Sequence, residues 1–244
     1  MFRGFGTLLN IVGIAGGATI GVLFGNRIPE KTRRLITDAL GCVTMLAAVD
    51  ALREIWNPRF ISALPKGWTI LTVLAALIIG GLVGALLRIE ERLERFGISL
   101  RERVAHSEKG RFLDGFMAAS LLFAIGPLAI LGSVSDGMGH GQQQLILKST
   151  LDCITSIAFG ATFGWGVAFS CIPVGIYQLL WTVSGWGLGN VMNATQVSAM
   201  TAVGGVLLVG ISLRVLSIKE IGVGDLLPAI FFAPLIATAA HTFI

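Results

Sequence analysis

The chain has 244 residues, of which 54% are hydrophobic and only 13% are charged, and its formal net charge is +4. A soluble domain carries roughly 25% charged residues, because its surface faces water. The composition therefore excludes an ordinary soluble protein and predicts a polytopic membrane protein whose main partner is the lipid bilayer. The basic excess does not indicate nucleic-acid binding, since membrane proteins concentrate Lys and Arg in their cytoplasmic loops.

Eight apolar stretches are each close to the roughly 20 residues that a helix needs to cross the hydrocarbon core. The expected spans cover residues 6–25, 35–56, 67–88, 112–134, 145–168, 171–188, 198–217 and 226–243. Very little sequence separates the fifth from the sixth, so the number falls to seven if these two do not both cross. The predicted fold class is an all-α transmembrane helix bundle of about eight spans (seven to eight), forming one integral membrane domain over residues 1–244.

The charged loops predict an orientation. The first span leads straight into a polar segment without a cleavage region, so we expect it to be retained rather than removed as a signal peptide. Most of the 18 Lys and Arg residues lie in loops at residues 27–34, 88–111 and 214–219. The positive-inside rule places these loops in the cytoplasm and the N-terminus outside it. The mixed charges of residues 89–111 predict a solvated cytoplasmic helix and loop.

Two segments of the chain resemble each other. Residues 14–30 and 78–91 both carry paired glycines before a charged end, and each leads to a span that opens near an aspartate. The similarity favours repeated helical hairpins, a plan found in many transporters. Chance similarity among glycine-rich apolar segments is the alternative, and the sequence leaves both open.

The first span carries a stripe of glycines at four-residue intervals, namely Gly13, Gly17, Gly21 and Gly25. This spacing places them on one helix face, where another backbone can approach closely. The stripe predicts helix packing, either within the bundle or between two copies in a homo-oligomer. No Gly-Lys-Ser/Thr follows these glycines, so a phosphate-binding loop is not indicated, and no cofactor is expected.

The fourth span contains a helix breaker followed by polar residues. Gly126 and Pro127 interrupt the apolar run, because proline removes a backbone donor and clashes with the preceding turn. Ser133, Ser135 and Asp136 follow within about three turns. A break inside the membrane frees backbone carbonyls that protein, water or a ligand must satisfy. The segment predicts a binding site, with a simple proline kink as the alternative.

The fifth span adds a second charged group of candidates. Lys148, Asp152 and Ser156 follow one another at four-residue intervals and therefore share a helix face. They form either a self-neutralising ion pair or one wall of a polar cavity for a small solute or ion. The oxygen ligands suit a hard cation or a proton, while Lys148 could attract an anion. Asn10 and Gln178 are further candidate lining residues, and the identity of any metal is left unknown.

The tetrapeptide Gly-Val-Gly-Asp ending at Asp225 has the form used by intramembrane aspartyl proteases. Such an enzyme needs a second aspartate that faces the first and shares its proton. Asp38 and Asp114 are the candidates, but all three acids lie at predicted span ends, where a structural role is favoured.

Five stretches together carry a family resemblance: "GTLLNIVGIAGGATIGVLFGNRIPE", "FAIGPLAILGSVSDG", "KSTLDC", "AVGGVLLVGI" and "GVGDLLPAIFFAPL". They are similar to the bacterial multi-pass membrane family numbered 554 among the domains of unknown function. The resemblance implies the bacterial cytoplasmic (inner) membrane and a transporter-like protein, without catalytic residues. Similar proteins often carry an acid where this chain has Ala199, and if that acid contributes to their site, the site of this chain differs there.

The favoured hypothesis is a non-enzymatic transporter of a small solute or ion, coupled to an ion gradient because no nucleotide-binding motif is found. The site would comprise Asp136, Asp152, Ser133, Ser135, Lys148, Ser156, Gly126, Pro127 and Asn10. The alternative is a non-transporting scaffold or partner subunit whose interface is the glycine stripe. A more remote alternative is the aspartyl protease.

Overall fold

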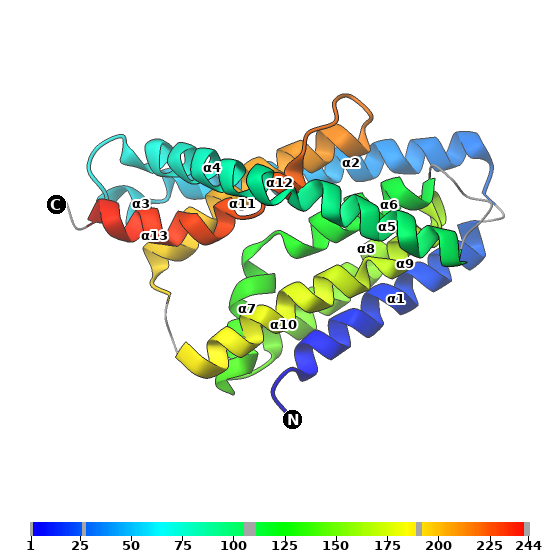
Figure 1. Cartoon of the computed structure of the whole chain (residues 1–244), viewed down its shortest axis with the longest axis horizontal. Helices are drawn as coiled ribbons and strands as arrows, with labels where there is room; N and C mark the ends of the chain where they lie inside the picture. The colour runs from blue at the N-terminus through cyan, green and yellow to red at the C-terminus, as the bar shows by residue number, and fades with distance from the viewer. Residues whose placement is uncertain (1, 26–27, 105–110, 189–191, 242–244) are drawn as a thin grey trace. The chain divides into compact units, whose positions relative to one another are not determined.

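The computed structural model describes residues 2–25, 28–104, 111–188 and 192–241, and within these ranges it contains helices and no strands. The elements, in chain order, are α1 (Phe5–Gly25), α2 (Glu30–Leu52), the 3-10 helix η1 (Arg53–Trp56), α3 (Pro58–Ser62), α4 (Trp68–Leu87), α5 (Ile89–Val104), α6 (Arg111–Ala124), α7 (Pro127–Met138), α8 (Gln143–Phe163), α9 (Gly166–Phe169), α10 (Cys171–Leu188), α11 (Ala194–Val215), α12 (Val223–Leu226) and α13 (Ala229–His241) (Figure 1). Seven segments are long and apolar enough to cross a membrane, and one bent pair of helices makes an eighth. The predicted all-α class and span number are confirmed.

The fifth and sixth spans are both of full length, at 21 residues for α8 and 22 residues from Gly166 to Gly187. Side-chain contacts show that they run in opposite directions. Along α1, Gly6 packs against Leu145 and Gly25 against Ala161, so α8 is parallel to α1. The contacts of α1 with α10 run the other way, from Thr7 beside Thr182 to Ile11 beside Gly175. The chain therefore reverses direction at Gly164 and Trp165, between α8 and the short α9 that opens the sixth span.

The fourth span is broken at the predicted position. Helix α6 ends at Ala124, α7 begins at Pro127, and the two helices are bent by 59°. Gly126 has φ 131°, a conformation that residues with a side chain rarely adopt. Pro127 then starts α7, where its missing N–H costs nothing because the first turn of a helix has no internal acceptor.

Contacts divide the chain into two compact units. Unit 1 comprises residues 1–40 and 93–191, and unit 2 comprises residues 41–92 and 192–244. Helices α2 and α5 each begin in one unit and end in the other.

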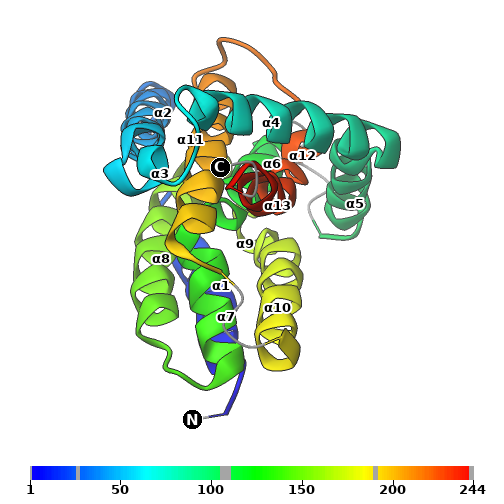
Figure 2. The ribbon, with the colours of Figure 1, turned by 90° about the vertical axis from the view of Figure 1, so that its left-hand side faces the viewer.

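In unit 1, α1, α7, α8 and α10 lie side by side (Figures 1 and 2). The glycine stripe of α1 faces α8, because a Cβ at Gly17 or Gly21 would overlap the carbonyl oxygen of Cys153 or Ile157. Gly13 and Gly25 make the neighbouring approaches. This face of α1 is therefore occupied within the chain and is not available to a second copy.

In unit 2, glycines of α4 likewise allow close backbone packing. Gly80 lies against the backbone of Ala229 and Gly84 against that of Asp225, so α4 packs closely on α12 and α13. Helix α11 is the most buried of the candidate spans that the structure describes. The two similar segments at residues 14–30 and 78–91 thus both include a glycine-lined face in close backbone contact.

The spans expose large apolar side chains on their outer faces. Examples from five of the helices are Leu23, Leu46, Leu82, Leu151 and Leu180. A soluble monomer rarely exposes apolar surface of this extent. These faces suit contact with lipid.

Candidate functional site

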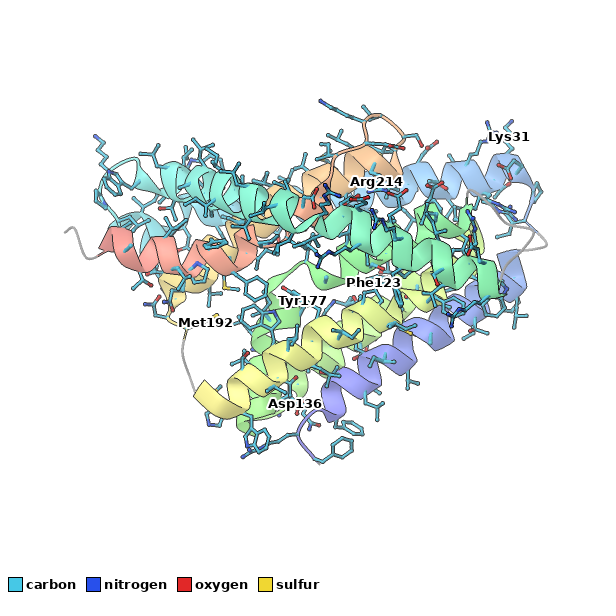
Figure 3. All side chains as sticks on the ribbon, in the orientation of Figure 1. Lys31, Phe123, Asp136, Tyr177, Met192 and Arg214 are labelled. Atoms are coloured by element: carbon cyan, nitrogen blue, oxygen red, sulfur yellow. The ribbon has the colours of Figure 1, made fainter. Side chains whose placement is uncertain are left out.

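The polar side chains of unit 1 gather where α1, α7, α8 and α10 meet. At the level where α1 starts, the carboxylate of Asp136 on α7 faces the beginning of that helix (Figure 3). Its Oδ2 accepts the backbone N–H groups of Gly4 and Gly6, both at 3.1 Å, and its Oδ1 accepts the side-chain amide of Gln142 at 3.0 Å. Gly6 lies in the first turn of α1 and Gly4 directly precedes that helix. The N–H groups at a helix start have no internal acceptors and lie at the positive end of the helix dipole. Asp136 is thus the cap of α1, although it is only 1% exposed.

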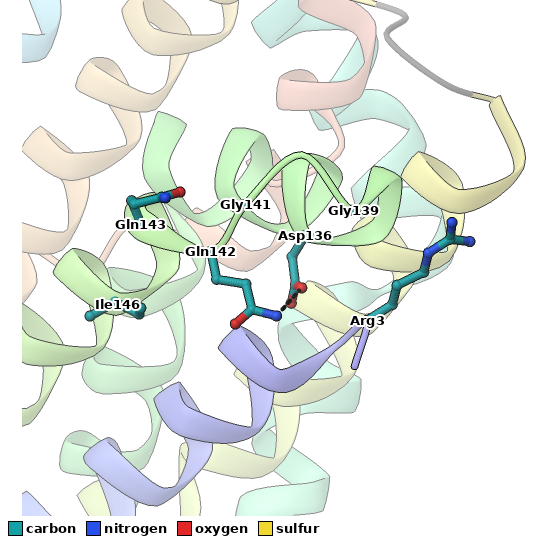
Figure 4. A pocket seen from close by; sticks show the side chains of 7 residues that line it. All are labelled: Arg3, Asp136, Gly139, Gly141, Gln142, Gln143 and Ile146. Carbon is teal, nitrogen blue, oxygen red and sulfur yellow. Dashed lines mark hydrogen bonds between the residues drawn. The ribbon is translucent and has the colours of Figure 1, made fainter. Parts of the chain in front are cut away.

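A pocket of about 310 Å³ opens beside this cap (Figure 4). It is lined by Arg3, Asp136, Gly139, Gly141, Gln142, Gln143 and Ile146. The side chain of Gln142 points toward Asp136, while Arg3 extends toward α10, where its guanidinium lies 5.8 Å from the ring centre of Trp186. Oε1 of Gln142 is buried and has no hydrogen-bond partner within the described part of the chain. The pocket therefore offers a buried acceptor, a carboxylate and a guanidinium near its walls.

A buried ion pair lies further along α8 than the pocket. The ammonium of Lys148 is 2.6 Å from Oδ2 of Asp152, one turn along α8. Asn10 of α1 donates its side-chain amide to the same oxygen at 3.0 Å. Lys148 is 6% exposed and Asp152 7% exposed, both in the first half of the membrane-length helix α8. Burying two charges costs several kcal/mol each before their attraction is counted, so this pair needs a structural or functional reason.

Gln178 of α10 lies at about the same depth as Asn10. Thr182 of α10 is 3.3 Å from Thr7, and Gly175 packs against the residue that follows Asn10. Gln178 lies between Gly175 and Thr182 and on the same helix face as both. It therefore points toward α1 at the turn that carries Asn10.

Several buried polar atoms of α1, α8 and α10 have no hydrogen-bond partner among the described residues. They are Oδ1 of Asn10, Oγ of Ser156, and both side-chain polar atoms of Gln178. All three side chains are fully buried. A buried unpaired polar group costs about 1–3 kcal/mol and calls for an explanation.

The residues predicted from the sequence fall into two levels. Asp136 lines the pocket, whereas Asp152 lies one turn of α1 deeper and outside the pocket lining. Ser133 and Ser135 donate to the backbone carbonyls of Ala129 and Gly141, at 2.6 Å and 3.2 Å, so their hydroxyls serve the local backbone. For Pro127, the side chain lies outside the described residues.

The pocket also contains residues that the sequence analysis did not single out. Gln142 precedes α8, Gln143 is its first residue, and Arg3 precedes α1. The run Gly-Gln-Gln-Gln between two spans was the available signal, because such polar clusters mark the edge of a membrane segment. The hydrogen bond from Gln142 to Asp136 depends on the fold of the loop between α7 and α8, which the local sequence pattern does not predict.

The Gly-Val-Gly-Asp segment of unit 2 has a different environment. Oδ1 of Asp225 accepts the backbone N–H of Glu90 at 2.9 Å, at the start of α5. The carboxylate of Glu90 in turn accepts the backbone N–H of Gly224 and the guanidinium of Arg214. Asp225 therefore caps a helix, as Asp136 does in unit 1. Ala199, where an acid was expected from similar proteins, is fully buried in α11.

Helices of membrane-spanning length, apolar outer faces and buried polar side chains together define a multi-pass helical membrane protein. The chain belongs to the family described as "Protein of unknown function (DUF554)", whose model matches residues 5–238. The resemblance found in the sequence is confirmed.

Two relatives match over nearly their whole length. The chain is 28% identical over 239 residues to the uncharacterized membrane protein YdfK of Bacillus subtilis (strain 168), covering 98% of both chains. It is 27% identical over 235 residues to the uncharacterized protein YqgA of Escherichia coli (strain K12), covering 93% of this chain and 94% of that one. No solved structure matches the chain significantly.

Proposed function

We propose that the protein transports a small solute or ion across the bacterial inner membrane. The observation that carries the proposal is the buried Lys148–Asp152 pair in a membrane-length helix, together with the buried polar atoms of Asn10 and Ser156 that have no hydrogen-bond partner among the described residues. Ionisable groups inside spans are costly and most often line substrate or ion pathways. A purely structural ion pair does not account for Oδ1 of Asn10, which is buried beside the pair without a hydrogen-bond partner among the described residues.

The pocket at Asp136 is the proposed entrance to this pathway. It lies at the start of α1, and the Asn10–Asp152 contact follows about one turn after Gly6 along that helix. Polar contacts continue between the two levels through Thr7 and Thr182. A ligand that enters at the pocket would thus meet polar groups on its way to the ion pair.

In this proposal the entrance lies outside the cytoplasm. The positive-inside distribution of Lys and Arg puts the N-terminus, and with it the start of α1, on the outer side. Because no nucleotide-binding motif is found in the sequence, active transport would draw on an ion gradient. In this proposal the protein is not an enzyme and needs no cofactor.

The scaffold alternative loses its proposed interface. Its basis was the glycine stripe of α1, which packs against α8 of the same chain. The protease alternative finds no support at Asp225, because that carboxylate is engaged as a helix cap.

Thermal unfolding of the full chain in detergent provides the first test. The probes are NaCl, LiCl and KCl, balanced with choline chloride, and acetate, lactate, alanine and glutamate. Wild type is compared with Asp152→Asn and with Asp50→Asn, which removes an exposed carboxylate from an exposed pair with Arg53. A ligand of the site should raise the Tm of wild type and Asp50→Asn but not of Asp152→Asn, because it binds the native site alone.

The same compound, isotopically labelled, should accumulate in liposomes that contain wild type and not in those that contain Asp152→Asn. If no probe distinguishes wild type from Asp152→Asn, or if the stabilising compound does not cross, the transport proposal fails and the scaffold alternative gains weight.

A further inference from the structure

Resting on the proposed function, in which the pocket beside Asp136 is the entrance, we infer that this pocket binds a small zwitterion of the amino-acid class. The ammonium of the ligand faces Asp136, and its carboxylate faces Arg3. The inference names the substrate class. Its basis is a cavity whose wall carries two opposite charges, each without an ion-pair partner in the described part of the chain.

The negative end of the pocket is Asp136. This carboxylate is only 1% exposed, and every hydrogen bond that it accepts from the described residues comes from a neutral N–H group. The dipole of α1 adds a positive charge of only about half an elementary charge. Buried charges in proteins are normally paired with an opposite charge or with a metal. Asp136 therefore leaves a negative charge that the cationic end of a ligand can balance.

The side chain of Gln142 adds an acceptor at the same end. Its Nε2 donates to the backbone carbonyl of Phe2 at 3.1 Å and to Oδ1 of Asp136 at 3.0 Å. Turning the amide over would place its oxygen against these two acceptors, so the nitrogen must face them. Oε1 therefore points away from Asp136 (Figure 4), and it is buried without a hydrogen-bond partner among the described residues. An N–H group of a ligand is the partner that this oxygen lacks.

The positive end of the pocket is Arg3. Its guanidinium lies over the ring of Trp186 and forms no ion pair within the described part of the chain. A Cβ added at Gly139 would lie 3.8 Å from Nε of Arg3, so the guanidinium borders the pocket at the end of α7. The planar edge of a guanidinium binds a carboxylate through two parallel hydrogen bonds. Arg3 thus offers a site for the anionic end of a ligand.

A zwitterion is the ligand that leaves the pocket neutral. The two walls together carry zero net charge, so a simple cation or a simple anion would leave an excess charge in a partly enclosed site, where it is costly. An amino acid balances both ends and adds no net charge. The volume of about 310 Å³ lies at the small end of the roughly 300–1,000 Å³ that is typical of ligand pockets. The pocket therefore suits an amino acid with few atoms.

The test measures binding to the full chain in detergent by isothermal titration calorimetry. The probes are glycine, L-alanine, β-alanine and γ-aminobutyrate, which differ in the separation of their two charges. Each is matched with its amide, which keeps only the ammonium, and with its N-acetyl form, which keeps only the carboxylate. At least one amino acid should bind, and both of its blocked forms should bind at least tenfold more weakly.

Two charge variants locate the binding. Arg3→Gln removes the positive end from an exposed side chain, and Asp136→Asn removes the negative end while it keeps an acceptor for the start of α1. Each should lower the affinity for the amino acid at least tenfold. Arg53→Gln and Asp50→Asn remove the same charges from an exposed pair and should leave the affinity unchanged.

A third variant tests the cavity without changing a charge or the cap of α1. Ile146 lines the pocket and is 41% exposed, so a larger side chain there fills the cavity without disturbing the protein interior. Ile146→Trp should elute as a folded protein and bind the amino acid at least tenfold more weakly. Full affinity of Arg3→Gln or of Ile146→Trp overturns the site, whatever the stability of Asp136→Asn.

The outcomes separate this inference from the transport proposal. An amide or an N-acetyl form that binds as tightly as its amino acid overturns the zwitterion. If no amino acid binds while another probe accumulates in liposomes, the inference fails and transport stands. If an amino acid binds through Arg3 and Asp136 but does not accumulate, the site stands and transport fails. If nothing binds and nothing crosses, both proposals fail.

Discussion

The carboxylate of Asp136 accepts the backbone N–H of Gly6 at 3.1 Å across 130 residues of sequence, and so α7 caps the first helix of the chain. The second oxygen faces the amide of Gln142, whose own Oε1 is buried without a partner in the described part of the chain. This arrangement gives Asp136 a structural role beside its place in the pocket.

The cap predicts a clear ranking of two substitutions. Asp136→Ala removes all three acceptor interactions and leaves the buried N–H of Gly6 unpaired, which should cost about 1–3 kcal/mol for that group alone. Asp136→Asn keeps one acceptor for Gly4 and Gly6, and rotation of the Gln142 amide lets its free Oε1 accept the new N–H. The Tm in detergent should therefore fall much more for alanine than for asparagine. Equal losses would show that the carboxylate charge, rather than the cap, is what matters at this position.

A second prediction concerns two glycines on opposite faces of α1. A Cβ at Gly21 would overlap the backbone of Ile157, whereas a Cβ at Gly16 meets nothing within 4 Å. Gly21→Ala should therefore force α1 and α8 apart and lower stability by about 1–3 kcal/mol or more. Gly16→Ala should raise stability by about 0.5–1 kcal/mol, because alanine favours the helix.

Thermal unfolding of the two variants side by side measures this difference. Both changes add one methyl group to the same helix, so each variant is the other's control. Similar losses for both would mean that α1 does not pack on α8 through its glycine stripe.

Local rules account for the parts of the structure that the sequence predicts well. Span length, the break at Gly126 and Pro127, and the four-residue spacing of Lys148 and Asp152 all depend on neighbours within a helix. The cap of α1 by Asp136 and the contact of Glu90 with Gly224 join residues more than 100 positions apart. Composition and periodicity contain no information about such pairs. The glycine stripe shows the same limit, since its spacing predicts a close contact but does not identify α8 as the partner.

A third prediction concerns the Glu90–Arg214 pair of unit 2. Both side chains are less than one-fifth exposed, and Glu90 also accepts the backbone N–H of Gly224. A double-mutant cycle with Glu90→Gln and Arg214→Gln should give a coupling energy of about 1.5–3 kcal/mol, as for a hydrogen bond to a charged group. The matched cycle on Asp50 and Arg53, whose side chains are 80% exposed, should give about 0.2–1 kcal/mol. Equal coupling energies in the two cycles would show that the Glu90–Arg214 pair is no more stabilising than the exposed Asp50–Arg53 pair.

The last prediction asks whether the Lys148–Asp152 pair is present for stability. Removing one partner of a buried ion pair leaves an uncompensated charge and typically costs about 3–5 kcal/mol. Lys148→Gln should therefore lower the Tm strongly. The double variant Lys148→Gln/Asp152→Asn should recover most of the loss, because Asn10 can still donate to the amide oxygen at position 152. A neutral pair that is as stable as the charged one, yet no longer responds to any ligand, would mean that the charges serve binding. If instead the double variant is as unstable as the sum of its single changes, the two residues are not coupled, and the ion pair does not govern the stability of unit 1.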